Sequence, residues 1–147
     1  NTYGPRMRVK DARQTFLGIW ICRLLEGKPV KVFGDGLQRR DYNYVDDVVD
    51  ALLLAAIDER SNGKIFNLGS EQVLSLEDTA RIMTEQNGGG TYEKVPFPPD
   101  RKAIDVGDFI CDFSVFAKTF GWRPKTSFED GIAKTLAYYR EHLAEYV

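Results

Sequence analysis

The chain has 147 residues, of which 43% are hydrophobic and 29% are charged, and its formal net charge is −2. This composition excludes a disordered chain and indicates a soluble globular protein with a core of its own. The balanced charge excludes the basic face of a general nucleic-acid-binding protein, and no apolar run approaches the roughly 20 residues that span a bilayer. The start of the chain does not resemble a signal peptide, so we expect a cytoplasmic protein without nucleic-acid or membrane partners.

Helices and short strands alternate along the first half of the chain. Apolar side chains recur at helical spacing up to Gly27, which predicts a helix that ends there. A β-rich stretch then runs into the turn Gly34-Asp35-Gly36, and a second one follows a turn at Gly63. After a loop at 1–11, the expected elements are a helix at 12–26, a strand at 30–34, a helix at 46–59 and a strand at 64–69.

The second half of the chain continues this alternation. The expected elements are a helix at 76–87, a strand at 91–95, a proline-punctuated loop at 96–108, a short helix at 115–120 and a last helix at 128–145. The pattern predicts a small mixed α/β lobe with short strands and about five helices.

Four polar residues mark the expected starts of helices. Asp46, Ser75, Ser114 and Ser127 each precede an apolar-periodic stretch, and a side-chain oxygen at such a position accepts a hydrogen bond from a free N–H of the first turn. Ser75 and Ser127 also have an aspartate three residues later, as in a capping box. We therefore predict that these four residues are N-caps.

The sequence lacks the residue patterns of a catalytic centre. Residues 34–39, GDGLQR, miss the third glycine of a dinucleotide-binding loop, and none of the seven tyrosines has a lysine four residues later. There is no nucleophile elbow and no metal-ligand cluster. Cys22 and Cys111 are expected to be buried free thiols of a reducing compartment, and His142 a solvated side chain.

Polar and aromatic groups on loops are the remaining candidates for a binding site. An arginine guanidinium donates two parallel hydrogen bonds to a phosphate, and an aromatic ring can stack on a base. Phe33 directly precedes the glycine turn. The arginines in or next to loops are Arg6, Arg8, Arg13, Arg39, Arg40 and Arg101. The alternative is that these arginines pair with neighbouring aspartates at the surface and that Phe33 belongs to the core.

Five segments occur together in an order typical of one family. They are NTYGPR (1–6), KPVKVFGDGLQRRDYNYVDDVVDAL (28–52), IFNLGS (65–70), DFSVFAKTFGWRPKTSFEDGI (112–132) and YY (138–139). With these segments the whole chain resembles the C-terminal, substrate-binding half of the extended short-chain dehydrogenase/reductases. That family comprises NAD-dependent nucleotide-sugar epimerases, dehydratases and decarboxylases.

The resemblance has consequences for fold and cofactor. In the family, the glycine-rich loop, the catalytic Ser or Thr and the Tyr-x-x-x-Lys pair all precede the position of Asn1. The resemblance therefore implies a single substrate-binding lobe over 1–147, without an N-terminal NAD-binding Rossmann domain and without catalytic residues. NAD is the cofactor of the parent family, and we expect none to bind this chain alone.

Three of the substrate-binding residues implied by the resemblance lie in its clearest motifs. Asn1 matches the family asparagine that contacts the substrate phosphate or sugar. Phe33 matches the aromatic residue that packs at the base, and Arg40 matches the arginine that binds the pyrophosphate. We expect the neighbouring Asp41 to orient an arginine.

Three further residues follow from weaker parts of the resemblance. Arg101 and Asp105 match an arginine and an aspartate that close over phosphate and ribose, with Lys102 in a competing register for the arginine. Arg13 lies where decarboxylase-like members have an arginine facing the phosphates. The expected ligand is a UDP- or dTDP-linked sugar.

Three hypotheses follow for the function of the chain. It is the nucleotide-sugar-binding lobe of an NAD-dependent epimerase or dehydratase, or a stand-alone binding module, or a structural module that self-associates without a ligand. In the family, the helix at 47–58 packs against the N-terminal domain. We therefore expect Val48, Leu52 and Leu53 to be exposed here and the isolated chain to self-associate.

Overall fold

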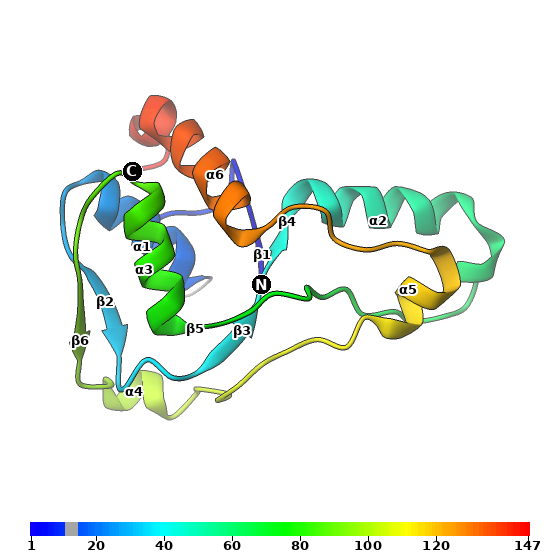
Figure 1. Ribbon diagram of the computed structural model, residues 1–147, viewed down its shortest axis with the longest axis horizontal. Coiled ribbons are helices and arrows are strands. Elements are labelled where there is room, and N and C mark those ends of the chain that lie inside the picture. The colour runs from blue at the N-terminus through cyan, green and yellow to red at the C-terminus, as the bar shows by residue number, and fades with distance from the viewer. Residues whose placement is uncertain (11–14) are drawn as a thin grey trace.

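The computed structural model describes residues 1–10 and 15–147, which form helices and three two-stranded sheets (Figure 1). The helices are α1 (Phe16–Leu25), α2 (Val45–Ile57), α3 (Leu76–Gln86), α4 (Pro99–Lys102), α5 (Ser114–Phe120) and α6 (Phe128–His142), with the 3-10 turns η1 (Glu59–Ser61) and η2 (Leu143–Glu145). The strands are β1 (Thr2–Tyr3), β2 (Val30–Phe33), β3 (Arg39–Asp41), β4 (Asn43–Tyr44), β5 (Val73–Ser75) and β6 (Tyr92–Val95). The predicted mixed α/β lobe with short strands is confirmed.

The three sheets join segments that are far apart in the sequence. β2 pairs in parallel with β6 from Val30↔Tyr92 to Phe33↔Val95, and β1 pairs in parallel with β4. β3 pairs antiparallel with β5, so that Arg40 lies opposite Leu74. These pairings bring the start of the chain, the glycine turn after β2 and the start of α3 to one region of the molecule.

The main core lies between β2 and the helices α1, α3 and α6. Its centre is aromatic, because Tyr3 and Tyr42 both lie against Phe128, with ring centroids 5.3 and 4.7 Å away. The Tyr42 hydroxyl lies 3.0 Å from Thr79 Oγ1, which satisfies a buried polar group. Burial raises the pKa of both tyrosine hydroxyls above the ordinary value, so both rings remain neutral in the core.

A second, smaller core lies between α2 and α5, at one end of the molecule (Figure 1). It contains Ala51, Phe116 and Trp122, and Phe66 packs against it. The arrangement buries one side of α2 and leaves the other side in contact with solvent.

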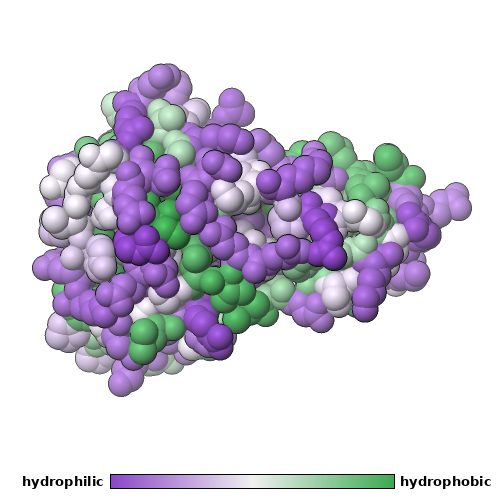
Figure 2. Space-filling model, viewed as in Figure 1, coloured by the Kyte–Doolittle hydropathy of each residue, from purple (hydrophilic) through white to green (hydrophobic). Residues whose placement is uncertain are grey.

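The exposed side of α2 carries large apolar residues. Leu52 is 61% exposed, Leu53 60% and Ile57 83%. Figure 2 shows apolar residues gathered at this end of the molecule. The expected exposure of Leu52 and Leu53 is confirmed, whereas Val48 is half-buried and its predicted exposure is wrong.

The predicted strand at 64–69 is wrong. The segment has no strand assignment, and Ile65 in it is 95% exposed. A β-rich sequence forms a strand only beside another strand that completes its hydrogen bonds, and within the described part of the chain no strand pairs with this segment. The pairing partner of β3 is β5 instead, which the sequence did not predict.

Most of the other helix and strand boundaries agree with those predicted from the sequence. β2, α3, β6 and α6 form as predicted, and α1 begins at Phe16, next to residues 11–14, which lie outside the described part of the chain. The proline-punctuated loop contains one unpredicted short helix, α4, whose first residue is Pro99. Proline fits the first helical position because its missing N–H would have no partner there.

Two of the four predicted N-caps are confirmed and two are wrong. Ser75 Oγ and Ser127 Oγ accept hydrogen bonds from N–H groups three residues later. α2 instead begins at Val45 after Tyr44, so Asp46 lies inside the first turn. α5 begins at Ser114 itself, whose N–H donates to Asp112 Oδ1 at 2.8 Å.

The two cysteines and the histidine can be compared with their predicted environments. Cys22 and Cys111 are free thiols as predicted, but both are half-buried, so the predicted full burial is wrong. Burial still raises the pKa of both thiols. His142 lies on α6 with Nδ1 2.9 Å from Glu145 Oε1.

No group of His, Cys, Asp and Glu side chains among the described residues could hold a metal ion. No helix in the same part of the chain has the length and apolar character needed to cross a membrane.

The N-cap of α6 gives a direct test of the fold. Ser127→Ala removes the oxygen that accepts from the Asp130 N–H at 3.1 Å, and we expect a loss of about 1 kcal/mol in the free energy of unfolding. Ser127→Thr keeps a hydroxyl that can accept from the Asp130 N–H and donate to Asp130 Oδ2, so its stability in urea denaturation should stay close to that of the unchanged chain. Equal losses in the two variants would contradict the capping role.

Candidate functional site

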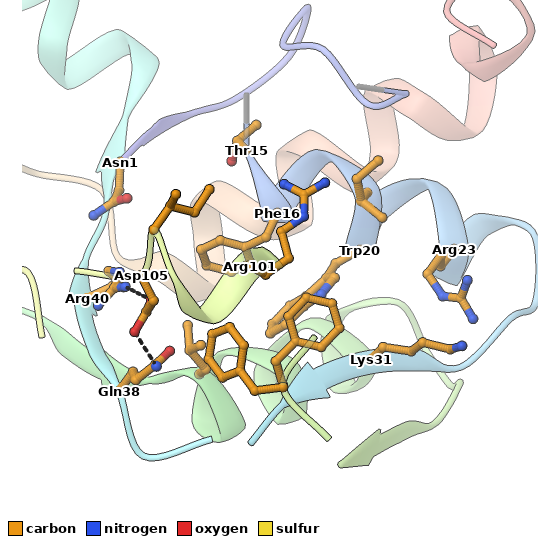
Figure 3. Close-up of a pocket in the computed structure, with 15 residues that line it drawn as sticks. Asn1, Thr15, Phe16, Trp20, Arg23, Lys31, Gln38, Arg40, Arg101 and Asp105 are labelled. Carbon is orange, nitrogen blue, oxygen red and sulfur yellow. Dashed lines mark hydrogen bonds and ion pairs between the residues drawn. The ribbon is translucent and has the colours of Figure 1, made fainter. Parts of the chain in front are cut away.

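A pocket of about 480 Å³ opens between α1, β2, β3 and the segment that contains α4 (Figure 3). Its lining residues are Asn1, Thr15, Phe16, Ile19, Trp20, Arg23, Lys31, Phe33, Gln38, Arg40, Leu76, Phe97, Arg101, Ile104 and Asp105. This volume lies within the range of small-molecule sites, and the mixture of apolar walls with a few charged groups is typical of them.

Helical and strand periodicities explain two walls of the pocket. On α1, Phe16, Trp20 and Arg23 follow each other at intervals of four and three residues, which puts them on one face of the helix. On β2, Lys31 and Phe33 face the pocket while the alternate residues Val30 and Val32 are fully buried in the core.

The charges in the lining are mainly positive. Arg23, Lys31, Arg40 and Arg101 contribute four cations, and Asp105 is the carboxylate among the lining residues. The whole chain carries a formal charge of −2, so this concentration of positive charge is local. A cleft with charges of one sign attracts ligands of the opposite sign, and this pocket therefore favours an anion.

Arg40 is held in a fixed position at one end of the pocket. It is 8% exposed, and its Nη1 donates to the carbonyl oxygens of Arg39, at 2.9 Å, and of Gly107. Its Nη2 lies 3.6 Å from Asp105 Oδ1. Because a buried guanidinium needs partners for its N–H groups, these contacts define where Arg40 presents its positive charge.

Asp105 is in turn held by polar neighbours. Its Oδ2 accepts from Gln38 Nε2 at 2.7 Å and from the Gly107 N–H at 3.1 Å (Figure 3). The carboxylate beside Arg40 is therefore Asp105. Asp41, predicted to orient an arginine, is buried and accepts instead from the Ser70 N–H at 3.1 Å, so that prediction is wrong.

The middle of the pocket is aromatic. The rings of Phe33 and Phe97 lie 5.6 Å apart, and those of Phe16 and Trp20 lie 4.8 Å apart. Such rings offer flat apolar surface on which a planar group can stack. The pocket can thus hold a ligand that combines an aromatic ring with an anion.

Five of the six sequence-predicted site residues line this one pocket, namely Asn1, Phe33, Arg40, Arg101 and Asp105. Arg13 lies outside the described residues. Arg39, by contrast, is exposed and pairs with Asp108 at 2.8 Å, as expected of a surface arginine. Whether the five residues bind a substrate stays a prediction.

Sequence reasoning missed several lining residues. The sequence pattern predicts Trp20 and Arg23 only as residues of a helix, although their spacing from Phe16 puts all three on the same helix face. Lys31 lies two residues before Phe33 and shares its side of the strand. Phe97 carries no such signal, because the loop that brings it against Phe33 has no period.

The comparisons with known proteins agree with this fold. Residues 1–69 match the NAD dependent epimerase/dehydratase family. The chain is 34% identical over 140 residues to a dTDP-glucose 4,6-dehydratase of Actinoplanes sp., covering 95% of this chain and 42% of that protein. It is 33% identical over 142 residues to a UDP-glucose 4-epimerase of Mycolicibacterium smegmatis, covering 95% of this chain and 43% of the relative.

A solved structure shows the same arrangement. The crystal structure of a UDP-glucose 4-epimerase from Thermotoga maritima, with UDP-glucose, is 35% identical with a TM-score of 0.81, covering 97% of this chain and 44% of that one. The chain is similar to the C-terminal part of proteins of the NAD-dependent epimerase/dehydratase family, and its fold matches theirs over the same part. It spans about two fifths of the length of the curated relatives it matches.

The family that the chain resembles is NAD-dependent, so the described residues should be able to form a dinucleotide site if this chain binds NAD. A dinucleotide site needs a strand that leads through a glycine-rich turn into a helix. Among the described residues, the glycine turn after β2 leads into another strand, β3, and presents no helix N-terminus to a pyrophosphate. The described residues do not fit NAD, and we derive no hydride-transfer step from them.

The charge balance of the pocket can be tested through Asp105. Asp105→Asn removes the carboxylate while leaving an oxygen that can accept from Gln38. We expect inorganic pyrophosphate to bind about 5-fold more tightly to this variant, because a negative charge beside Arg40 is removed. Isothermal titration calorimetry measures the change. Asp108→Asn, which alters the exposed pair with Arg39, is the control and should have little effect, and unchanged pyrophosphate binding to Asp105→Asn would contradict the role of its charge.

Proposed function

We propose that this chain is a nucleotide-sugar-binding lobe of an NAD-dependent nucleotide-sugar epimerase or dehydratase, and that it is not catalytic by itself. The observation that carries the proposal is a pocket in which cationic side chains flank a group of aromatic rings. A nucleoside diphosphate has the matching composition, since it joins a planar base to two phosphates.

The pyrophosphate of the ligand binds at the Arg40 end of the pocket. Arg40 is already held by carbonyl oxygens and by Asp105, so little side-chain entropy is lost when a phosphate arrives. Arg101 lines the same pocket from α4 and adds a second guanidinium. Two arginines suit a diphosphate because each can donate two parallel hydrogen bonds.

The base and the sugar take the remaining surfaces. Phe33 and Phe97 supply a wall for the base. Asn1 lines the pocket at the Arg40 end, where its side-chain amide can donate to and accept from a phosphate or a sugar hydroxyl (Figure 3). Its main-chain oxygen accepts from the Asn43 N–H at 3.1 Å, which fixes the position of the residue.

The relatives support this choice of ligand. Those named above act, by their names, on dTDP-glucose or UDP-glucose, and the Thermotoga maritima structure contains UDP-glucose. A UDP- or dTDP-linked sugar is therefore the ligand class proposed for this pocket. The role of the chain's own residues is to bind and orient that ligand.

Removing the buried guanidinium tests the proposal. Arg40→Met keeps a long unbranched side chain but loses the charge, and we expect UDP to bind at least about 10-fold more weakly, because a charge-assisted hydrogen bond contributes roughly 1.5–3 kcal/mol. Titration calorimetry with UDP gives the affinities, and a thermal melt establishes that the variant is folded.

Arg39→Met is the matched control for this experiment. Arg39 is the neighbouring arginine of β3, but it is exposed, pairs with Asp108 and does not line the pocket. Its variant should bind UDP within about twofold of the unchanged chain, since surface pairs contribute little. Equal losses at the two positions, or no UDP binding by the unchanged chain, would overturn the proposed function.

We also propose that the chain self-associates through α2. The supporting observation is its exposed apolar side, where Leu52, Leu53 and Ile57 are each more than half exposed. Apolar residues gathered in this way on one face mark an interaction surface more often than scattered ones do. Burying them against a second copy would remove them from water without any change in the fold.

Charged substitutions on this face test self-association. We expect the double variant Leu52→Glu, Leu53→Glu to lower the concentration-dependent mass measured by light scattering, because two carboxylates would resist burial. Leu37→Glu, at an exposed leucine of the loop after β2, is the control and should leave the mass unchanged. A monomer at all concentrations of the unchanged chain would contradict the proposal.

A further inference from the structure

The pocket has a second cationic end, which the proposed pyrophosphate site does not use. Figure 3 shows Asn1, Gln38, Arg40 and Asp105 on one side of the pocket and Arg23 with Lys31 on the opposite side. The two ends are separated by aromatic side chains, among them Trp20. A ligand that spans the pocket must therefore place different groups at the two ends.

The two cations at this second end come from different elements. Arg23 lies on the last turn of α1, and its Nε donates to the Pro29 main-chain oxygen at 2.6 Å, which fixes the guanidinium beside β2. Lys31 lies on β2, on the same side of the strand as Phe33. A ring placed against Phe33 is thus next to the Lys31 ammonium.

Arginine and lysine side chains donate hydrogen bonds and accept none. A base edge that faces them must therefore carry acceptors. Uracil and thymine have a carbonyl oxygen at position 4, whereas cytosine has an amino group there, which is a donor. A pair of donor-only side chains favours the carbonyl and leaves the amino group of cytosine without a partner.

The connectivity of a nucleotide directs this edge to the second end. In a pyrimidine the ribose is attached at N1, and C4 lies directly across the ring from N1. When the phosphates are held at Arg40 and the ring lies against Phe33, the substituent at C4 points away from the phosphates. That direction leads toward Arg23 and Lys31.

We infer that Arg23 and Lys31 determine base specificity, selecting uracil or thymine nucleotides over cytosine nucleotides. The inference rests on the proposed function, because it requires the phosphates at Arg40 and the base on the aromatic rings. It assigns a separate role to two residues that the pyrophosphate does not need.

The experiment compares UDP, CDP and inorganic pyrophosphate in titration calorimetry at 0.15 M salt. We expect the unchanged chain to bind UDP about 10-fold more tightly than CDP, since one well-placed base contact gives roughly 1–3 kcal/mol of discrimination. In Lys31→Met this ratio should fall to about 3 or below, because the variant loses affinity for UDP rather than gaining affinity for CDP. Pyrophosphate should bind about equally to both proteins, because it does not reach the second end and salt screens the distant charge.

Two further variants complete the design. Lys28→Met removes a lysine that is exposed, pairs with Glu26 at 2.7 Å and does not line the pocket, so the ratio of UDP to CDP affinity should stay unchanged. Arg23→Gln replaces a donor-only group by an amide that can also accept, and it should lower the ratio as Lys31→Met does. A thermal melt of each variant verifies its fold.

The outcomes separate the inference from the proposed function. Equal binding of UDP and CDP to the unchanged chain, with both weakened by Arg40→Met, would overturn the inference and leave the proposed function standing. Equal weakening of UDP, CDP and pyrophosphate in Lys31→Met would place Lys31 at the phosphates and also overturn the inference. Failure of every nucleotide and of pyrophosphate to bind would overturn the proposed function itself.

Discussion

The buried guanidinium of Arg40 is the interaction on which the pocket depends. It joins β3 to the segment after α4, because it donates to the Gly107 oxygen and pairs with Asp105 across 67 and 65 positions of the sequence. The main-chain bond from the Phe109 N–H to the Arg39 oxygen, 3.0 Å long, holds the same two segments together. These contacts hold the segment after α4 against β3. The buried charge of Arg40 thus also contributes to the shape of the pocket.

The molecule combines two regions with different solvent exposure. The region of α1, α3 and α6 buries its apolar residues in one core, and the pocket lies at its edge. The region of α2 and α5 buries only a small cluster and exposes the opposite side of α2. The segment 64–69 lies in the second region, and its β-rich residues have no strand partner in the described chain. Exposed apolar residues gathered on one side of a helix are a feature typical of interaction surfaces.

Much of the fold could be predicted because it depends on local patterns. The helical spacing of α3 and α6 and the capping oxygens of Ser75 and Ser127 act within one turn, so they form wherever the chain places them. Asp46 has the same capping chemistry, but its predicted role is wrong, because the pairing of β4 with β1 ends at Tyr44 and α2 has its N-cap two residues earlier than predicted. The strand at 64–69 failed for a related reason, since a strand needs a neighbour that its own sequence does not specify.

The sequence by itself determined the helices other than α4, the strands β2 and β6, and the family motifs that include Asn1, Phe33 and Arg40. It determined these because periodicity, capping and motif spacing are properties of short segments. Only the tertiary structure decided that Asp105 is the partner of Arg40 and that Lys31 shares the pocket with Arg23. Those contacts join residues whose separation in the chain carries no information about their distance in space. They depend on how helices and strands pack, and packing responds to the shape of the whole core.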